Sequence, residues 1–501
     1  MNASRRLFLA GAAATGAFAA QACASTSAAA GGIRPALLRS QNQVWADVEY
    51  LSGLGPRYVG NAAHTNFVNF LEEKLVECGM TLSSVPHNTL QQWLPRNIAL
   101  RSRSETLPVG AFCRWSAQTG PQGVTAPLHY LGRVEGASRF SMNLYPDRRS
   151  TMTVPPEVRG KIALVEITVG HRPLGLMFEN RVDHMFDKLG RPMPPLQGPS
   201  ASNMAATPDG FERQLKEAGA VGLIYAWRGL SDADAQGQSR LGTDNLPSLW
   251  VVPTTGRKLL QLAQTGEPVT ITVEADTQAN APTRTIVATL PGASEESVIL
   301  WSHTDGPNAL QENGPIAIIN MMRYFSRIPR AERRRTIQVV IPEAHFAEQY
   351  VPTSGWITER PELIEQSVAV IACEHLGGNE WLSDPISNTY TPTGEHEVAF
   401  AFCPTAPLRA LARQAVADQE FGRQVLINTD AFAFTPGIAP WRRVQMPCFA
   451  YISIPSYLMA DDGVSGHLNK LNPALWYQQM LTLTRLMHAV DATPSDVVRR
   501  A

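Results

Sequence analysis

Residues 298–350 read VILWSHTDGPNALQENGPIAIINMMRYFSRIPRAERRRTIQVVIPEAHFAEQY, and this stretch decides the fold. Two short apolar runs, 298–301 and 336–341, have the length and composition of buried strands. The first is followed by Ser-His-Thr-Asp, and the second leads into Glu-Ala-His. The mostly apolar residues 315–326 between them predict a helix. Because ligands bind outside the carboxyl ends of the strands in α/β sheets, we expect the functional site at this edge.

The bulk composition is typical of a globular protein. The chain has 501 residues, a formal net charge of −1 and 44% hydrophobic residues. This length is sufficient for two or three domains. The balanced charge gives no indication of nucleic-acid binding. Apart from the N-terminal segment, no apolar run is long enough to span a bilayer.

Residues 1–32 predict an export signal and a tether that are not part of the fold. Residues 4–9 read SRRLFL and precede an alanine-rich apolar run that ends at Ala20. This order resembles a twin-arginine signal, and an ordinary secretory signal is the alternative. We therefore expect export to the periplasm or cell envelope. Cys23 is a candidate lipid-anchor site, although Gln21 fits a lipoprotein cleavage pattern poorly.

The remaining chain divides into three parts. Residues 33–119 contain two amphipathic helical patterns, at 40–54 and 62–78, followed by strand-like residues. Residues 120–278 resemble a separate unit built mainly from short strands. From 279 to 501, strands and helices alternate, which predicts a partly parallel sheet covered on both faces.

The order of these parts resembles the bacterial zinc aminopeptidases and the glutamate carboxypeptidase II group. The resemblance rests on Gly55-Pro56-Arg57 with Gly60 between the two predicted helices, and on the His-x-Asp of His303 and Asp305. Residues 158–162, 218–220 and 246–247 match recurring pieces of the protease-associated (PA) domain inserted in those proteins. The resemblance implies an α/β fold of the zinc-exopeptidase, aminopeptidase-like class, an α/β/α sandwich with an inserted β-rich PA domain. It covers nearly all of the chain after the signal.

The resemblance also implies a metal site. In the family, a His, a bridging Asp, a Glu, an Asp and a second His hold two zinc ions, and a further Glu is the general base. His303 matches the first ligand, and Asp305 matches the carboxylate that supports it. Glu312, followed by Asn313, stands at the bridging Asp, and Glu374 stands at the other Asp.

Other positions depart from the family's pattern. His345 lies where the family has its Glu-Glu pair, and Leu458 stands at the closing His. A Glu in place of an Asp moves the carboxylate by about 1.5 Å, which exceeds the tolerance of metal–ligand distances. Since Leu458 cannot bind a metal, we do not expect a two-zinc site of the family's type. His467 could replace the missing His only if the loop were rebuilt.

We therefore predict a site for one divalent metal ion, in the first place zinc, bound by His303, Glu312 and Glu374. His345 is the predicted base or a further ligand, and Glu343 is a second candidate base. The alternative is that these groups only form hydrogen bonds with one another beneath a loop.

Five further side chains are predicted to support the ligands: Asp305, Asn313, His375, Asp461 and His467. His375 directly follows Glu374, so it would point to the opposite face if the strand continued.

Two functions are compatible with this sequence. One is an exported metallohydrolase that resembles an aminopeptidase and cleaves a peptide or small amide substrate. The other is a catalytically inactive protein of the same fold that acts as a binding or scaffold module, as the transferrin receptor ectodomain does. The retained His303, Asp305, Glu312 and Glu374 favour the hydrolase, whereas Leu458 and the replaced Glu-Glu pair favour the binding module.

Overall fold

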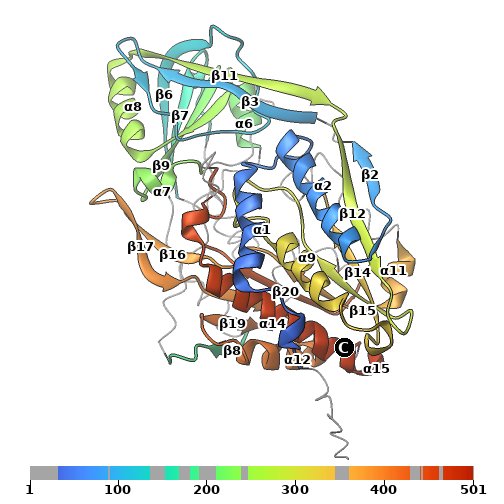
Figure 1. The fold of residues 1–501 in the computed structure, drawn as a ribbon. Helices are drawn as coiled ribbons and strands as arrows, with labels where there is room; N and C mark the ends of the chain where they lie inside the picture. The colour runs from blue at the N-terminus through green and yellow to red at the C-terminus, as the bar shows by residue number, and fades with distance from the viewer. Residues whose placement is uncertain are drawn as a thin grey trace, which may run out of the picture.

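A computed structural model describes residues 32–88, 91–135, 153–168, 181–190, 210–238, 246–344, 360–428, 441, 444–461 and 467–499. Two β-sheets with their helices make up most of these residues, the larger at the bottom of Figure 1 and the smaller at the top. The export signal, Cys23 and His345 lie outside the described residues, so what was inferred for them stays a prediction.

The larger sheet positions the predicted site. Its strands are β1 (Thr81–Leu82), β2 (Val85–Asn88), β8 (Val182–Phe186), β12 (Pro282–Leu290), β13 (Ser297–Trp301), β14 (Thr336–Ile341), β15 (Ser367–Cys373), β18 (Ala399–Phe402), β19 (Gln424–Ile427) and β20 (Cys448–Ser453). Their order is β1-β12-β14-β13-β15-β20-β18-β19-β8, and β2 also pairs with β12. β14, β13, β15 and β20 are parallel, so their carboxyl ends lie along one edge.

Helices cover both faces of this sheet, as the sequence predicts. The described helices on the first face are α1 (Gln41–Gly53), α2 (Ala62–Glu77), α9 (Gly314–Phe325), α12 (Ala406–Ala417), α14 (Pro473–Ala492) and the short α15 (Ser495–Val498). On the other face, Leu363 and Ile364 of α11 (Pro361–Gln366) pack against the core. The strand side chains alternate accordingly, with Leu300 in the first core and Ile299 in the second. This alternation explains why the central strands are apolar at most positions.

The smaller sheet has the order β4-β3-β11-β6-β7-β9-β10-β5. Its strands are β3 (Gln91–Arg101), β4 (Thr106–Leu107), β5 (Ala111–Phe112), β6 (Val124–Glu135), β7 (Ile162–Thr168), β9 (Gly222–Arg228), β10 (Ser248–Val251) and β11 (Pro268–Ala279). Its helices are α6 (Phe211–Glu217), α7 (Asp232–Ala235) and α8 (Pro253–Thr265). The predicted boundary at residue 120 falls between β5 and β6 of this sheet, and the division into domains stays a prediction.

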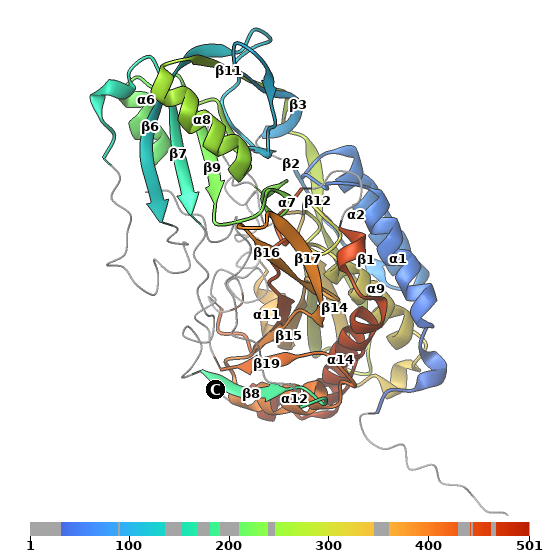
Figure 2. The same cartoon turned by 90° about the vertical axis from the view of Figure 1, so that its left-hand side faces the viewer.

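Side-chain and backbone contacts connect the two sheets. A separate hairpin consists of β16 (Asn379–Asp384) and β17 (Thr389–His396), and it extends towards α7 (Figure 2). The backbone N–H of Ser231 donates to Ser383 Oγ of this hairpin at 2.8 Å. The N–H of Asp461 donates to the carbonyl of Gly237 at 3.0 Å. The loop that follows β20 is therefore attached to the smaller sheet.

In the described part of the chain, no helix is both long and apolar enough to cross a membrane.

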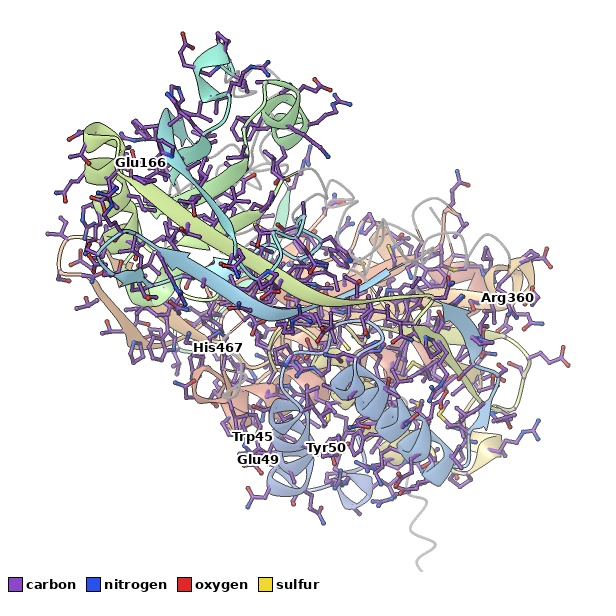
Figure 3. The ribbon with its side chains drawn as sticks, turned by 90° about the horizontal axis from the view of Figure 1, so that it is seen from above. Trp45, Glu49, Tyr50, Glu166, Arg360 and His467 are labelled. Atoms are coloured by element: carbon purple, nitrogen blue, oxygen red, sulfur yellow. The ribbon has the colours of Figure 1, made fainter. Side chains whose placement is uncertain are left out.

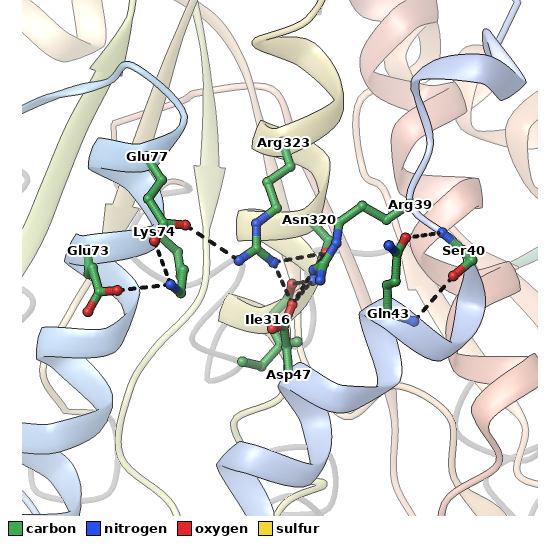
Figure 4. Close-up of polar contacts among 10 residues, drawn as sticks. All are labelled: Arg39, Ser40, Gln43, Asp47, Glu73, Lys74, Glu77, Ile316, Asn320 and Arg323. Atoms are coloured by element: carbon green, nitrogen blue, oxygen red, sulfur yellow. Dashed lines mark hydrogen bonds and ion pairs between the residues drawn. The ribbon is translucent and has the colours of Figure 1, made fainter.

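Asp47 connects α1 to α9 (Figure 4). Its Oδ2 accepts hydrogen bonds from Arg39 at 2.6 Å, Arg323 at 2.5 Å and Asn320 at 3.0 Å. Because Asp47→Ala leaves these donors without their charged acceptor, we expect the free energy of unfolding to fall by about 2–3 kcal/mol, measured by urea denaturation. Glu49→Ala is the control, since this carboxylate is exposed on the same helix (Figure 3). Equal losses in the two variants would contradict a role for the Asp47 contacts.

Candidate metal centre

Two adjacent parallel strands deliver the first two candidate ligands. β13 and β15 pair in register near their ends, with Trp301 opposite Ala372. Ser302 Oγ donates to the carbonyl of Cys373 at 2.8 Å, which connects the two chain segments just beyond the strands. The next residues, His303 and Glu374, are 1% and 3% exposed. The sheet therefore places an imidazole and a carboxylate side by side in a buried position.

His303, Glu374 and His375 converge on one point. His303 Nε2 lies 2.8 Å from Glu374 Oε2, and His375 Nε2 lies 3.3 Å from the same oxygen. One donor atom from each residue lies within 4.8 Å of the other two. Within the described ranges, no other group of three His, Cys, Asp or Glu side chains meets this spacing. The candidate metal centre is therefore this group of three residues.

His375 joins the group because the strand ends before it. β15 ends at Cys373, and His375 has a positive φ of 57°. The expectation that His375 faces away assumed a continuing strand, and the turn instead brings its ring towards Glu374. His375 Nδ1–H donates to the carbonyl of Ser453 at 2.9 Å, so Nε2 carries the lone pair.

The two imidazoles differ in charge. Burial lowers the pKa of His303, but hydrogen bonds to Asp305 and Glu374 outweigh this effect and raise that pKa to about 9. Burial lowers the pKa of His375 to about 4, although the Glu374 charge opposes the shift. Without a metal ion, His303 is therefore an imidazolium between two carboxylates, and His375 is neutral.

The donor set fits one divalent metal ion. Two imidazole nitrogens and one carboxylate are the protein ligands of many catalytic zinc sites. His375 Nε2 is buried and has no hydrogen-bond partner in the described part of the chain, although it faces the Glu374 carboxylate. Two hydrogen-bond acceptors, His375 Nε2 and the Glu374 carboxylate, therefore face each other, and a cation between them would satisfy both. Behind His303, the Asp305 carbonyl accepts from Nδ1 at 3.0 Å, which is the usual outer support of a metal-binding His.

Glu312 has a different partner. Its carboxylate forms an ion pair with Arg57, and both side chains are fully buried. It does not belong to the group of three residues described above. The neighbouring Asn313 exchanges two hydrogen bonds of 2.8 Å with the backbone of Leu376. Asn313 therefore connects the start of α9 to the loop that carries His375.

Glu343 lies at the end of β14 but points towards β12. Its Oε2 accepts a hydrogen bond from Thr285 Oγ1 at 2.5 Å and lies 3.9 Å from His87 Nε2. Burial raises the pKa of the Glu343 carboxyl, and the hydrogen bond from Thr285 opposes the shift. In the described residues, Glu343 does not join the group of three.

The loop after β20 holds the remaining predicted residues. The hydroxyl of Tyr58 donates to the Asp461 carboxylate, so Asp461 connects this loop to the segment between α1 and α2. The ring of His467, labelled in Figure 3, lies 5.7 Å from that of Tyr457 in an edge-on contact. Leu458, at the position of the family's closing His, is 3% exposed and belongs to the core.

The pKa of His303 predicts a pH-dependent stability. The pKa of His303 is about 9 in the folded chain and 6.5 for an ordinary histidine, so protonation of His303 stabilises the folded state. This stabilisation is complete below pH 6.5 and is lost as the pH rises through 9. We expect the unfolding free energy of metal-free protein to fall by at most about 3 kcal/mol over this range. Urea denaturation at several pH values measures it. His303→Gln should abolish this dependence, whereas His87→Gln should preserve it; the same slope in both variants would contradict the assignment.

Several solved structures share this architecture. The zinc aminopeptidase BSAP from Bacillus subtilis is 13% identical, with a TM-score of 0.60 over 90% of this chain and 95% of that chain. A peptidase M28 precursor from Shewanella amazonensis SB2B is 14% identical, with a TM-score of 0.59 over 91% and 98%. An aminopeptidase from Aneurinibacillus sp. strain AM-1 is 14% identical, with a TM-score of 0.53 over 90% and 93%. No family model and no curated protein matches the sequence.

The comparison confirms the predicted fold class. The chain has the mixed α/β fold of the zinc aminopeptidases over nine-tenths of its length. At this level of identity the likeness concerns the fold alone. The PA-like character of the inserted unit stays a prediction.

Proposed function

We propose that this chain is an exported, metal-dependent hydrolase of peptide or other amide bonds. One divalent metal ion, in the first place zinc, is held by His303, Glu374 and His375. The single observation that carries the proposal is the convergence of these three donor groups within 4.8 Å. This ligand set keeps two residues of the sequence prediction and replaces Glu312 with His375. The fold shared with zinc aminopeptidases supports the choice of an amide substrate.

The chain's own groups prepare this chemistry. When bound, a divalent metal supplies Lewis-acid polarisation of a carbonyl and activation of water. Asp305 fixes the orientation of His303, and the Ser453 carbonyl fixes His375 with Nε2 directed at Glu374. Glu343 and His345 stay the candidate proton acceptors from the sequence, and in the structure Glu343 accepts a hydrogen bond from Thr285 and lies outside the group of three. Burial raises the pKa of Glu343, which favours proton uptake at that carboxylate.

The same proposal includes the location of the protein. The SRRLFL motif supports export by the twin-arginine route to the periplasm or cell envelope, and Cys23 is the candidate site of a lipid anchor. Mass spectrometry of the mature protein, after expression of the chain with its full N-terminus, tests both export and lipid attachment at Cys23. A mass that still includes residues 1–20 would contradict export.

Metal content and activity test the proposed function together. We expect about one equivalent of metal per chain in the purified protein, measured by elemental analysis. A panel of aminoacyl and N-acyl amides, assayed with zinc, manganese and cobalt, should contain a substrate. His303→Ala should lose both metal and activity. His129→Ala is the matched control, since this imidazole lies in β6 of the smaller sheet and outside the group of three.

A binding or scaffold module is the second candidate, and the Arg57–Glu312 ion pair favours it. An internal cation already neutralises a carboxylate at a position where the resembling enzymes bind metal. If the protein is a binding or scaffold module, the folded protein should contain no stoichiometric metal, and added zinc should leave its melting temperature unchanged. A rise in melting temperature with zinc that His303→Ala abolishes would favour the hydrolase.

A further inference from the structure

We infer that Arg57 is an internal cation that withdraws Glu312 from metal binding, so that the site holds one metal ion rather than two. This inference rests on the proposed function and defines its metal stoichiometry. It gives Arg57 a role that the sequence motif alone does not indicate. Arg57 acts through Glu312 and does not contact the reacting atoms, so it is a positioning residue.

The ion pair is completely enclosed. Arg57 lies in the segment between α1 and α2, and Glu312 lies just before α9. The guanidinium Nη2 faces Glu312 Oε1, and neither side chain has any exposed surface. Within the described residues, this ion pair is the only polar contact of the Glu312 carboxylate oxygens. The negative charge of Glu312 is therefore neutralised by Arg57.

Backbone groups hold Arg57 in place. Its N–H donates to the carbonyl of Gly306 at 2.9 Å, and the N–H of Gly306 donates back at 3.1 Å. Nη1 donates to the carbonyl of Leu51 at 3.3 Å and Nη2 to that of Asn308 at 2.7 Å. The contacts with Gly306 and Asn308 attach Arg57 to the loop that follows His303 and Asp305, and the contact with Leu51 attaches it to α1. If the Glu312 carboxylate moved elsewhere, the Arg57 guanidinium could follow it only by breaking these hydrogen bonds.

The Arg57 side chain remains charged under ordinary conditions. Burial lowers its pKa to about 9, and the Asp461 charge opposes the shift. The guanidinium is therefore protonated at neutral pH.

Gly306 leaves the space that Glu312 occupies. A Cβ on Gly306 would overlap the second carboxylate oxygen of Glu312. The carboxylate therefore lies against the backbone of the loop directly after Asp305. It is next to the segment that carries His303 but is directed at Arg57.

This arrangement opposes a second metal ion in three ways. If Glu312 turned to a metal, the buried guanidinium would lose its directly contacting carboxylate and keep only the charge of Asp461, which is unfavourable. The fixed positive charge of Arg57 also repels another cation nearby. In addition, Leu458 supplies no ligand where the resembling enzymes have their closing His. The remaining donors His303, Glu374 and His375 suffice for one ion.

A metal-binding experiment tests the inference directly. Zinc content and zinc affinity are measured for the wild type, the neutral double variant Arg57→Met/Glu312→Gln, and Glu374→Gln. We expect one equivalent in the wild type and one in the double variant, with dissociation constants that agree within about threefold, because Glu312 is not a ligand. Glu374→Gln should bind zinc at least about 100-fold more weakly.

Two results would overturn the inference while leaving the proposed function intact. One is two equivalents of zinc in the wild type. The other is a loss of zinc in the folded double variant as large as in Glu374→Gln. A wild type that binds no zinc would instead overturn the proposed function together with the stoichiometry.

The ion pair has a separate test that needs no metal. In metal-free protein, a double-mutant cycle compares the melting temperatures of Arg57→Met, Glu312→Gln and their combination. Each single variant leaves one buried charge unpaired, so we expect each to lower the melting temperature by roughly 5 °C or more. The double variant should lose less than the sum of the two. Additive losses would overturn the pairing, and a single variant too unstable to fold supports it if the double variant folds.

Discussion

Replacing Glu374 with glutamine should remove the metal ion and lower kcat/KM for amide hydrolysis by about 1000-fold or more. Glu374 Oε2 is the atom that both imidazoles face, at 2.8 Å from His303 and 3.3 Å from His375. Glutamine preserves the size of the side chain but removes its charge. A metal ion contributes several kcal/mol to stabilisation of the transition state, and each 1.36 kcal/mol is a factor of ten in rate.

The measurement combines kinetics with elemental analysis on the same preparation. Glu49→Gln is the matched control, because the same substitution occurs at an exposed position on α1 (Figure 3). A Glu374→Gln protein that is folded and retains full activity would show that the reaction occurs elsewhere. Loss of activity with metal still bound would assign Glu374 to the chemistry and not to metal retention.

The sheet was predictable because its central strands have a local signature. The apolar runs at 298–301 and 336–341 correspond to β13 (Ser297–Trp301) and β14 (Thr336–Ile341). Strands that are buried on both faces have apolar side chains at most positions, so each strand can be recognised on its own. The proximity of His303 and Glu374 then follows from parallel pairing, which aligns the ends of neighbouring strands.

The details of the site were less predictable because they depend on contacts that no local pattern encodes. The position of His375 depends on the residue at which β15 ends and on a positive φ immediately after it. The pairing of Glu312 with Arg57 joins segments that are far apart in the sequence. Spacing identified Glu312 as a possible ligand but could not identify the cation beside it. The sequence shows Arg57 between the two predicted helices, but its burial, and therefore its need for a partner, appears only in the structure.

The extent of the smaller sheet also could not be predicted from local sequence patterns. β3 (Gln91–Arg101) pairs along its length with β11 (Pro268–Ala279), and the strands between them in the sequence, apart from β8 of the larger sheet, complete the smaller sheet. Pairing between strands so distant in sequence is set by tertiary packing, and the strand-like character of the residues after the second helical pattern did not reveal it.

Gly314→Ala should destabilise the protein and weaken metal binding together. Gly314 is the first residue of α9, and a Cβ at this position would overlap the carbonyl oxygen of Cys373 and the hydroxyl of Ser302. Those two residues directly precede Glu374 and His303. The start of α9 can therefore pack closely against the ends of β13 and β15 because Gly314 has no side chain.

An added methyl group must separate these three elements. Overpacking of this kind costs about 1–3 kcal/mol of stability, because a well-packed interior cannot absorb the extra volume. The same displacement moves His303 relative to Glu374, and metal–ligand distances tolerate only about ±0.2 Å. We therefore expect zinc affinity to fall by roughly 10- to 100-fold, measured by competition with a chelator on folded protein.

Gly53→Ala distinguishes this effect from a general effect of alanine in place of glycine. Gly53 is the last residue of α1, and a Cβ there would meet no atom within 4 Å. This variant should keep the wild-type zinc affinity and have equal or slightly higher stability, because alanine restricts the unfolded chain. If Gly314→Ala were destabilised but bound zinc as tightly as the wild type, the spacing of β13 and β15 would not control the site. If both properties fall together, the contact at Gly314 sets the distance between the two ligands.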